Sequence, residues 1–234
     1  MSRHRTRLFL LAGAAALVVA APGSAKRRPE APLPIAKIYF EYNSSANDLG
    51  VHVIADGEDW RRFQLENPAG RKLIRLDARG PYRELGLTEL FFEGAEPSLD
   101  DVPLDELLAL FPEGEYEFEA LGVDGVEQVG VGILRHAIPA GPEVTADVGP
   151  GDSIAIRWEL VDAPPPGFPS RPIDVVAYQV IVEPFQVNLP GTATQVTLPP
   201  EFAASLAPGE HPFEVLAIEA SGNQTITEGS FTTQ

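Results

Sequence analysis

The sequence contains no cysteine in 234 residues, and this absence removes several kinds of chemistry. Thiol nucleophiles, thiolate metal sites and redox exchange all need cysteine sulfur. Small secreted domains often rely on disulfides when they cannot build a large core. This chain must therefore hold its fold by the burial of apolar side chains.

Basic residues are also scarce, with 17 Lys and Arg against 34 Asp and Glu and a formal charge of −17. Residues 1–25 carry three of the arginines and no acid, so their removal leaves 14 basic residues and a charge of −20. Nucleic-acid binding depends on counterion release by Lys and Arg contacts. We therefore expect no nucleic-acid partner and no attraction to anionic lipid.

Long apolar runs are absent except for Leu8–Ala21, which has 14 residues. Arginines precede this run and small residues follow it, which is the layout of a secretory signal peptide. The alternative, a transmembrane anchor, needs about 20 apolar residues. We predict a signal peptide over residues 1–25, cleaved between Ala25 and Lys26. The mature protein is then secreted or periplasmic and is not inserted in a membrane.

Two proline-rich breaks divide the rest of the chain. Residues 26–35 are charged and show no periodicity, which predicts a flexible leader. Residues 139–142 interrupt strand-like sequence and predict a linker. The remaining length suits two domains of about 100 residues, 36–138 and 143–234.

Alternation of apolar and polar residues dominates the second block. In SIAIRWEL and VAYQVIVE every second residue is apolar, which is typical of strands with one buried face. Short strands between regular turn signals favour an antiparallel sandwich. The inward-facing residues predicted in these two segments are Ile154, Ile156, Trp158, Leu160, Val176, Tyr178, Val180 and Val182.

The first block also consists mainly of strand-like segments. One segment, Pro103–Phe111, has leucines at helical spacing after a proline suited to a first helical turn, and it predicts a single short helix. The predicted strands are KIYFEY, VHVIAD, RRFQLE, KLIRLDA, LTELFFE, YEFEALGV and EQVGVGILR.

One stretch is written twice, as GEYEFEALGVD at Gly114–Asp124 and as GEHPFEVLAIE at Gly209–Glu219. Each copy follows a turn with a proline and precedes the last strand of its block, which indicates a duplicated sandwich. Coincidence between two acidic strands is the alternative. The predicted inward residues are Tyr116, Phe118 and Ala120 in one copy, and His211, Phe213, Val215 and Ala217 in the other.

The second block resembles the fibronectin type III domain. The resemblance lies in PEV, SIAIRW, YQVIV, TQVTLPP and LAPGEHPFEVLAIEASGN, and it covers roughly residues 140–234. It implies a sandwich of three and four strands with Trp158 in the core. His211 departs from the tyrosine that is usual in the family, and Pro212 suggests that its strand pairs only from Phe213 onward.

The expected fold class is all-β, with two tandem antiparallel β-sandwich domains of the immunoglobulin-like or fibronectin type III kind and one short helix in the first. More broadly, the chain looks like an exported bacterial protein with a fibronectin type III domain. The core residues expected from these patterns are Trp158, Tyr178, Tyr116, His211 and Phe213.

Catalytic motifs are not evident. The three histidines after residue 25, His52, His136 and His211, stand in no recognisable motif, and neither G-x-S-x-G nor HExxH occurs. Each histidine is more simply a packed or solvated side chain. Two carboxylates could serve a glycosidase, but no pair is singled out. We predict no enzyme activity and no cofactor.

Oxygen-bearing residues cluster early in the first block, where calcium is one interpretation. The spacing is not that of a helix–loop–helix site, so a solvated hairpin turn is the plainer reading. The calcium candidates are Glu41, Asn43, Asn47, Asp48 and Asp56.

Loops at the ends of a sandwich often bind partners, and the candidates here are Phe168, Phe185 and Asn223. Each could instead cover the end of its own core. We predict a non-catalytic exported binding or scaffold module that recognises a protein or polysaccharide through loops or strand edges. The alternative is an enzyme or accessory subunit with a carboxylate site in the first domain. Such an enzyme would concentrate perturbed carboxylates in a concave pocket there.

Overall fold

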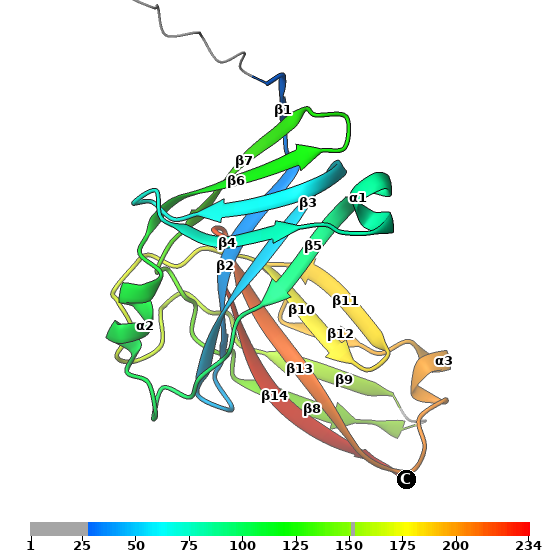
Figure 1. Cartoon of the computed structure of the whole chain (residues 1–234). Helices are drawn as coiled ribbons and strands as arrows, with labels where there is room; N and C mark the ends of the chain where they lie inside the picture. Colours follow the sequence, from blue (N-terminus) through cyan, green and yellow to red (C-terminus); the bar gives the residue numbers. More distant parts are fainter. Residues whose placement is uncertain (1–27, 151–152) are drawn as a thin grey trace, which may run out of the picture.

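The structure is a computed structural model that describes residues 28–150 and 153–234 (Figure 1). The predicted signal peptide and its cleavage site lie outside the described residues. Within the described part of the chain, no helix is long and apolar enough to cross a membrane.

Strands make up most of the first domain, and two short helices accompany them, one more than the single helix that the sequence predicted. Its elements are β1 (Glu30–Pro32), β2 (Ile35–Asn43), β3 (Asp48–Glu66), β4 (Lys72–Asp77), α1 (Pro81–Leu85), β5 (Leu87–Glu93), α2 (Leu104–Leu110), β6 (Gly114–Gly122) and β7 (Glu127–Leu134).

The long strand β3 organises the first domain. Its first half pairs with β2 and β5, and its second half pairs with β4 and β6. The sequence predicted two strands here, at residues 51–56 and 61–66. The structure has one strand of 19 residues, and its pairing shifts between Asp56 and Trp60. Such an irregularity bends a strand, so a single strand can serve both halves of the domain.

The buried side chains of the first domain form one core between these halves. Tyr116 and Phe118 are fully buried there, as the repeated stretch predicted. Trp60 is also fully buried, although the sequence analysis assigned it to no strand. Helix α2, predicted at Pro103–Phe111, contributes Leu107 and Leu108 to this core.

The second domain is a sandwich of a three-stranded and a four-stranded layer. Strands β12, β9 and β8 form the first layer, and β14, β13, β10 and β11 form the second. This is the arrangement that the resemblance implied, and it confirms the all-β fold class. The elements are β8 (Val144–Val148), β9 (Ile154–Trp158), β10 (Val175–Val182), β11 (Phe185–Pro190), β12 (Gln195–Thr197), α3 (Pro200–Ala203), β13 (Gly209–Glu219) and β14 (Gln224–Thr233).

The predicted alternation holds for most of this core, with two corrections. Trp158, Tyr178 and Phe213 are buried between the layers. Leu160 is 55% exposed because β9 ends at Trp158. Val176 is 50% exposed because the pairing of β10 with β13 shifts at this position, which turns its side chain outward.

The repeated stretches form β6 and β13, and they share one local geometry. Each begins with a glycine at positive φ, 142° at Gly114 and 144° at Gly209. The hydroxyl of Tyr116 donates to Pro112 O at 3.0 Å, and His211 Nε2 bonds Ala207 O at 2.8 Å. Both side chains therefore tie the strand start to the carbonyl four residues earlier.

Two predictions for the start of β13 need correction: His211 is only half-buried instead of lying in the core, and the strand pairs before Phe213. His211 lies at the edge of the core, stacked on Phe231. Strand β13 pairs with β14 from Gly209 onward, earlier than predicted. It pairs with β10 only from Glu214, so that ladder needs no donor from Pro212.

The expected flexible leader is partly ordered. Residues Glu30–Pro32 form β1, which pairs in parallel with β7, and Leu33 is only 5% exposed. An apolar side chain with a place in the core offsets the entropy lost on ordering this segment.

The two domains share a sheet. Strand β14 pairs in parallel with β2, at Gln224 opposite Glu41 and at the two positions that follow. The pairings β14–β2 and β1–β7 are thus exceptions to the expected antiparallel order. Two separate clusters of buried side chains still remain, largely on either side of residues 139–142.

Candidate functional site

The site is built on the three-stranded part of the first domain formed by β2, the first half of β3, and β5. Successive side chains of a strand point to opposite faces. Ile38, Val51 and Phe92 face an apolar pocket, whereas Glu41 and His52 face the other way. One set of strands therefore carries two sites of different chemistry, one on each face.

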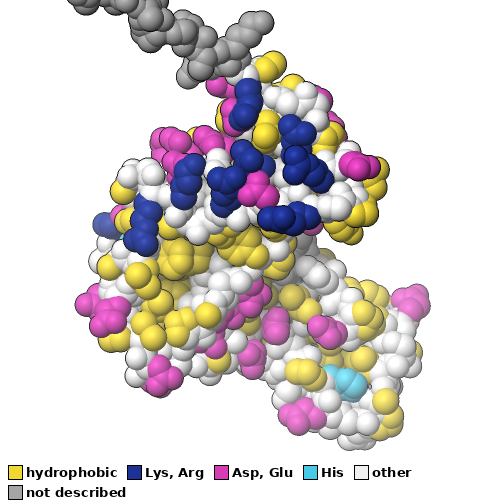
Figure 2. Space-filling view, viewed as in Figure 1, with side chains coloured by type: hydrophobic (Ala, Val, Ile, Leu, Met, Phe, Trp, Pro, Cys, Tyr) yellow, Lys and Arg dark blue, Asp and Glu magenta, His cyan; other side chains and the backbone are white. Residues whose placement is uncertain are grey.

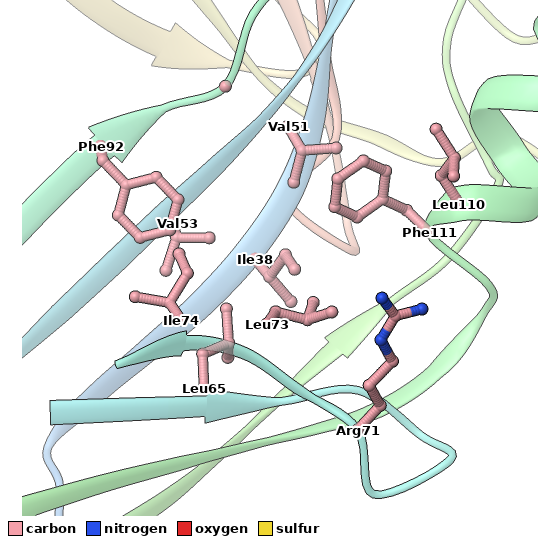
Figure 3. A pocket seen from close by; sticks show the side chains of 11 residues that line it. Ile38, Val51, Val53, Leu65, Arg71, Leu73, Ile74, Phe92, Leu110 and Phe111 are labelled. Atoms are coloured by element: carbon pink, nitrogen blue, oxygen red, sulfur yellow. The ribbon is translucent and has the colours of Figure 1, made fainter. Parts of the chain in front are cut away.

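The inner face lines an open pocket of about 330 Å³, which side chains of β4 and of the end of α2 also border (Figure 3). A neighbouring hollow of about 360 Å³ runs along α2 and shares Val51, Gly94, Leu110 and Phe111 with it. We refer to these two adjoining hollows together as the apolar groove. The residues that line the first hollow are Ile38, Val51, Val53, Leu65, Arg71, Leu73, Ile74, Phe92, Gly94, Leu110 and Phe111.

Arg71 carries the only ionisable side chain in the lining of this groove. It ends the turn between β3 and β4, where Asn67 fixes the backbone: Asn67 Oδ1 accepts from Arg71 N at 2.9 Å, and Asn67 N donates to Arg71 O at 2.9 Å. In Figure 3 the guanidinium extends from this turn toward the pocket. Within residues 28–150 and 153–234, Arg71 forms no ion pair.

A band of basic side chains lies beside the groove, and Figure 2 shows it directly above an apolar area. The segment from β3 to α1 holds seven of the 14 basic residues that follow residue 25. Asp77 pairs with two of them and Glu66 with a third. The seven residues are Arg61, Arg62, Arg71, Lys72, Arg75, Arg79 and Arg83. This segment is therefore rich in basic residues on a chain that is otherwise strongly acidic.

The outer face carries a cluster of one histidine and three glutamates. His52 Nε2 lies 3.2 Å from Glu96 Oε1, 3.7 Å from Glu41 Oε1 and 3.9 Å from Glu93 Oε2. The imidazole is 5% exposed, and Tyr39 packs against it with ring centroids 5.2 Å apart. The ligand atoms of Glu41, His52 and Glu96 lie within 4.8 Å of one another.

Local packing positions each member of this cluster. Glu96 follows β5 and folds back over Gly50, where a Cβ would lie 2.5 Å from Glu96 Cγ. Glu41 accepts a hydrogen bond from the side-chain amide of Gln224. Burial raises the pKa of Glu41, and His52 and Gln224 oppose this rise. Burial, with Glu41 and Glu93 nearby, raises the pKa of Tyr39 to about 12.

The five calcium candidates are spread over several local networks. Only Glu41 belongs to the cluster of ligand atoms. Asn43 Oδ1 accepts from Ser45 N and Ala46 N, and its amide donates to Glu228. The remaining candidates have other neighbours: Asn47 bonds Asp100 and Tyr42, Asp48 has its pKa raised by burial and by Glu228, and Asp56 lies opposite Glu89.

The three binding candidates lie in contacts within the chain. Phe168 packs on Tyr42 of the first domain, with ring centroids 4.9 Å apart. Phe185 begins β11 and stacks on Phe202 at 5.4 Å. Asn223 is 1% exposed, and its side-chain amide joins the two domains, so a partner cannot reach it in this structure.

Sequence reasoning did not select His52, Glu93, Glu96 or Arg71 for a site. The alternation in VHVIAD sets His52 apart from Val51 and Val53 on the opposite face of the strand, and this is a signal that could have found it. Nothing in the sequence places Glu96 beside Glu41, because their proximity depends on how β2 and β5 flank β3.

Comparisons with known proteins identify no family. No family profile and no curated protein sequence matches this chain. Solved structures that are similar in part include the spore cortex lytic enzyme SleM of Clostridium perfringens, at 15% identity and a TM-score of 0.32. That match covers 43% of this chain and 29% of the enzyme.

A two-domain fibronectin type III segment of chicken tenascin is 15% identical, with a TM-score of 0.29 over 88% of this chain and all of the segment. A bacterial ice-binding adhesin is 10% identical, with a TM-score of 0.26 over 88% of this chain and 65% of the adhesin chain. All three TM-scores are below 0.5, so the assignment of the fold rests on the strand order itself.

Proposed function

We propose that this chain is an exported, non-catalytic binding module whose first domain binds an apolar, acidic segment of a partner protein in the groove. The observation that supports this most is the apolar groove beside a band of basic residues on a protein of net negative charge. Apolar anchors of the partner would fill the groove, and its carboxylates would face the band.

The groove suits a protein segment better than a polysaccharide. Its volume is within the range of ligand pockets, and desolvated apolar pockets are where protein interfaces concentrate their binding energy. Sugar hydroxyls need several polar partners, and the lining offers a single polar side chain, Arg71. Positive potential beside the groove would also steer an acidic segment toward it.

The distribution of carboxylates supports a binding module over the rival enzyme. An active site of the predicted kind would gather perturbed carboxylates in the pocket of the first domain. The groove has none in its lining, and Glu41, whose pKa is raised, lies on the opposite face of the sheet. A hollow that does contain carboxylates, Glu183 and Glu214 beside His211, belongs to the second domain.

We extend the proposal to the layout of the chain. Residues 1–25 act as the signal peptide, and the mature protein works in the periplasm or outside the cell. Residues 36–138 form the binding domain, 139–142 the linker, and 143–234 the fibronectin type III-like domain that supports it. The secretory pattern of the first 25 residues and the two buried clusters support this layout.

The test uses the chain from residue 26 and two labelled synthetic peptides. Both peptides carry the same leucine and phenylalanine anchors, flanked by glutamates in one and by lysines in the other. We expect the glutamate peptide to bind at least about tenfold more tightly at low salt, and the difference to shrink as salt rises. Equal affinities for the two peptides would contradict the proposal.

Variants locate the binding surface. Leu110→Asp places a charge in the groove at a side chain that is 64% exposed, so the fold should survive. It should weaken binding of the glutamate peptide at least about tenfold, and Arg71→Glu should weaken that binding by a similar factor. Leu85→Asp, at 73% exposure and outside the groove, is the matched control and should leave affinity unchanged. Unchanged peptide affinity in Leu110→Asp would exclude the groove as the binding site.

A further inference from the structure

We infer that Glu41, His52 and Glu96 bind a zinc ion on the outer face of the first domain. This site is separate from the groove, since it uses the opposite faces of β2 and β3 and the chain that follows β5. The ion would hold three segments of the chain together with one nitrogen and two oxygen ligands.

The spacing of the ligand atoms fits a tetrahedral ion. Zinc lies about 2.1 Å from nitrogen and oxygen ligands, which places two ligands of a tetrahedron about 3.4 Å apart. His52 Nε2 lies 3.2 Å from Glu96 Oε1 and 3.7 Å from Glu41 Oε1, on either side of that value. Glu93 Oε2 also lies 3.9 Å from this nitrogen, but Glu93 does not belong to the group whose ligand atoms all lie within 4.8 Å of one another.

The donor set favours zinc over calcium. Calcium takes six to eight oxygen ligands, whereas imidazole nitrogen with carboxylates suits zinc and other first-row metals. His52 is the element of the site that the calcium interpretation of the sequence lacked. Its imidazole is buried and directed into the carboxylates, whose side chains are 15%, 28% and 49% exposed, so an ion can enter from the glutamate side.

The net negative charge of the cluster also favours the binding of a cation. Three glutamates surround one imidazole, and in the described part of the chain no Lys or Arg pairs with any of them. A protonated His52 would offset one negative charge at most. A divalent ion offsets two while keeping every ligand in place.

The surroundings already orient the ligands. Tyr39 and Phe91 pack on the His52 ring, with centroids 5.2 and 5.7 Å away. Gln224 donates its amide to the second oxygen of Glu41, which leaves the first oxygen directed at His52. Such outer contacts fix ligand geometry in zinc sites. Because Gln224 begins β14, zinc binding would also stabilise the junction between the domains.

The experiment measures Zn²⁺ alone, added to the chelator-treated chain from residue 26, by competition with a chromophoric chelator and by thermal unfolding. We expect one ion per chain and a higher melting temperature, with no competition from excess Ca²⁺. Co²⁺ in place of Zn²⁺ should show the visible absorption of a tetrahedral ion with nitrogen and oxygen ligands.

Three variants assign the ligands. Glu96→Gln should lower the affinity for zinc at least about 100-fold. Loss of a contact outside the ligand shell already lowers metal affinity about 10- to 100-fold. Gly50→Ala keeps every ligand but displaces Glu96, so it should also lower the affinity for zinc. Glu89→Gln, on β5 opposite Asp56, is the control and should bind as the wild type does.

Failure of the wild type to bind zinc, or zinc affinity unchanged by both Glu96→Gln and Gly50→Ala, would overturn the inference. The peptide experiment on the groove is independent of either result, because Leu110 and Arg71 line the other face.

Discussion

At the scale of single residues, charge placement explains more than charge number. Asp77 is exposed, yet Arg62 Nε and Arg75 Nε each donate to one of its oxygens, at 2.8 and 2.9 Å. Hydrogen bonds from Arg75 and Arg62 lower the pKa of Asp77 from 3.8 to about 2. The same carboxylate thereby neutralises part of the basic band, whereas Arg71 forms no ion pair within the described residues.

A pH-dependent loss of stability follows from Asp77. Its pKa is lower in the folded state, so its contribution is present above about pH 4 and disappears as the pH falls through about 2. Asp77→Asn should therefore lower the melting temperature at pH 7. Below pH 3 the melting temperature of this variant should approach that of the wild type. Exposed pairs are screened, so the gap should also narrow in high salt.

Asp162→Asn, at an exposed position, is the control for this series and should match the wild type throughout. A gap for Asp77→Asn that persists at the lowest pH would show that the effect is not the titration of this carboxylate.

At the scale of elements, the repeated stretch is the clearest case in which sequence and structure agree. Both copies form the next-to-last strand of their domain, and both begin with a glycine that has positive φ. Tyrosine in one copy and histidine in the other reach the same backbone position. The surroundings of the two glycines differ, however, and this difference can be measured.

Alanine at the two glycines should separate backbone strain from crowding. Gly209→Ala adds a Cβ with no heavy atom within 4 Å, so only the positive φ opposes it, at about 1–3 kcal/mol. At Gly114 the new Cβ would also lie 2.8 Å from Pro68 Cγ, so Gly114→Ala should cost more. Urea unfolding of both variants tests the order. Equal costs, or a larger cost at Gly209, would contradict the role given to Pro68.

At the scale of the whole molecule, the junction decides how the domains behave. Asn223 accepts from Phe40 N at 2.8 Å and donates to Arg135 O at 2.7 Å and Ala137 O at 3.0 Å. Thr225 donates to Pro139 O, and β14 pairs with β2 alongside. These contacts make the second domain an extension of the first domain's sheet.

We expect the chain from residue 26 to unfold in one calorimetric transition, because the shared sheet couples the two cores. Asn223→Ala leaves the buried Phe40 N and Ala137 O, and the partly buried Arg135 O, without this partner, at a cost of about 3 kcal/mol, and should split the transition into two. Asn188→Ala, at an exposed position of β11, is the control and should keep a single transition. Two transitions in the wild type would contradict the coupling.

Much of the fold follows from the sequence because strand formation is recorded locally. Alternation predicted β5 at Leu87–Glu93 with its observed ends and placed Trp158 and Tyr178 in the core. The short strand β11 was missed, since it lies on the edge of its layer and its alternation is brief. Val176 was misplaced because one irregular pairing reverses the face of a side chain.

The sequence by itself determined that this protein is built of strands, that one strand sequence occurs in two similar copies, and that cysteine chemistry is absent. Only the tertiary structure decided that Glu96 reaches His52 across Gly50, that Arg71 borders an apolar groove, and that β14 continues the sheet of β2. The physical reason is that alternation is a property of neighbours along the chain. These contacts depend instead on pairing between segments that lie from tens of residues to more than 180 residues apart in the sequence.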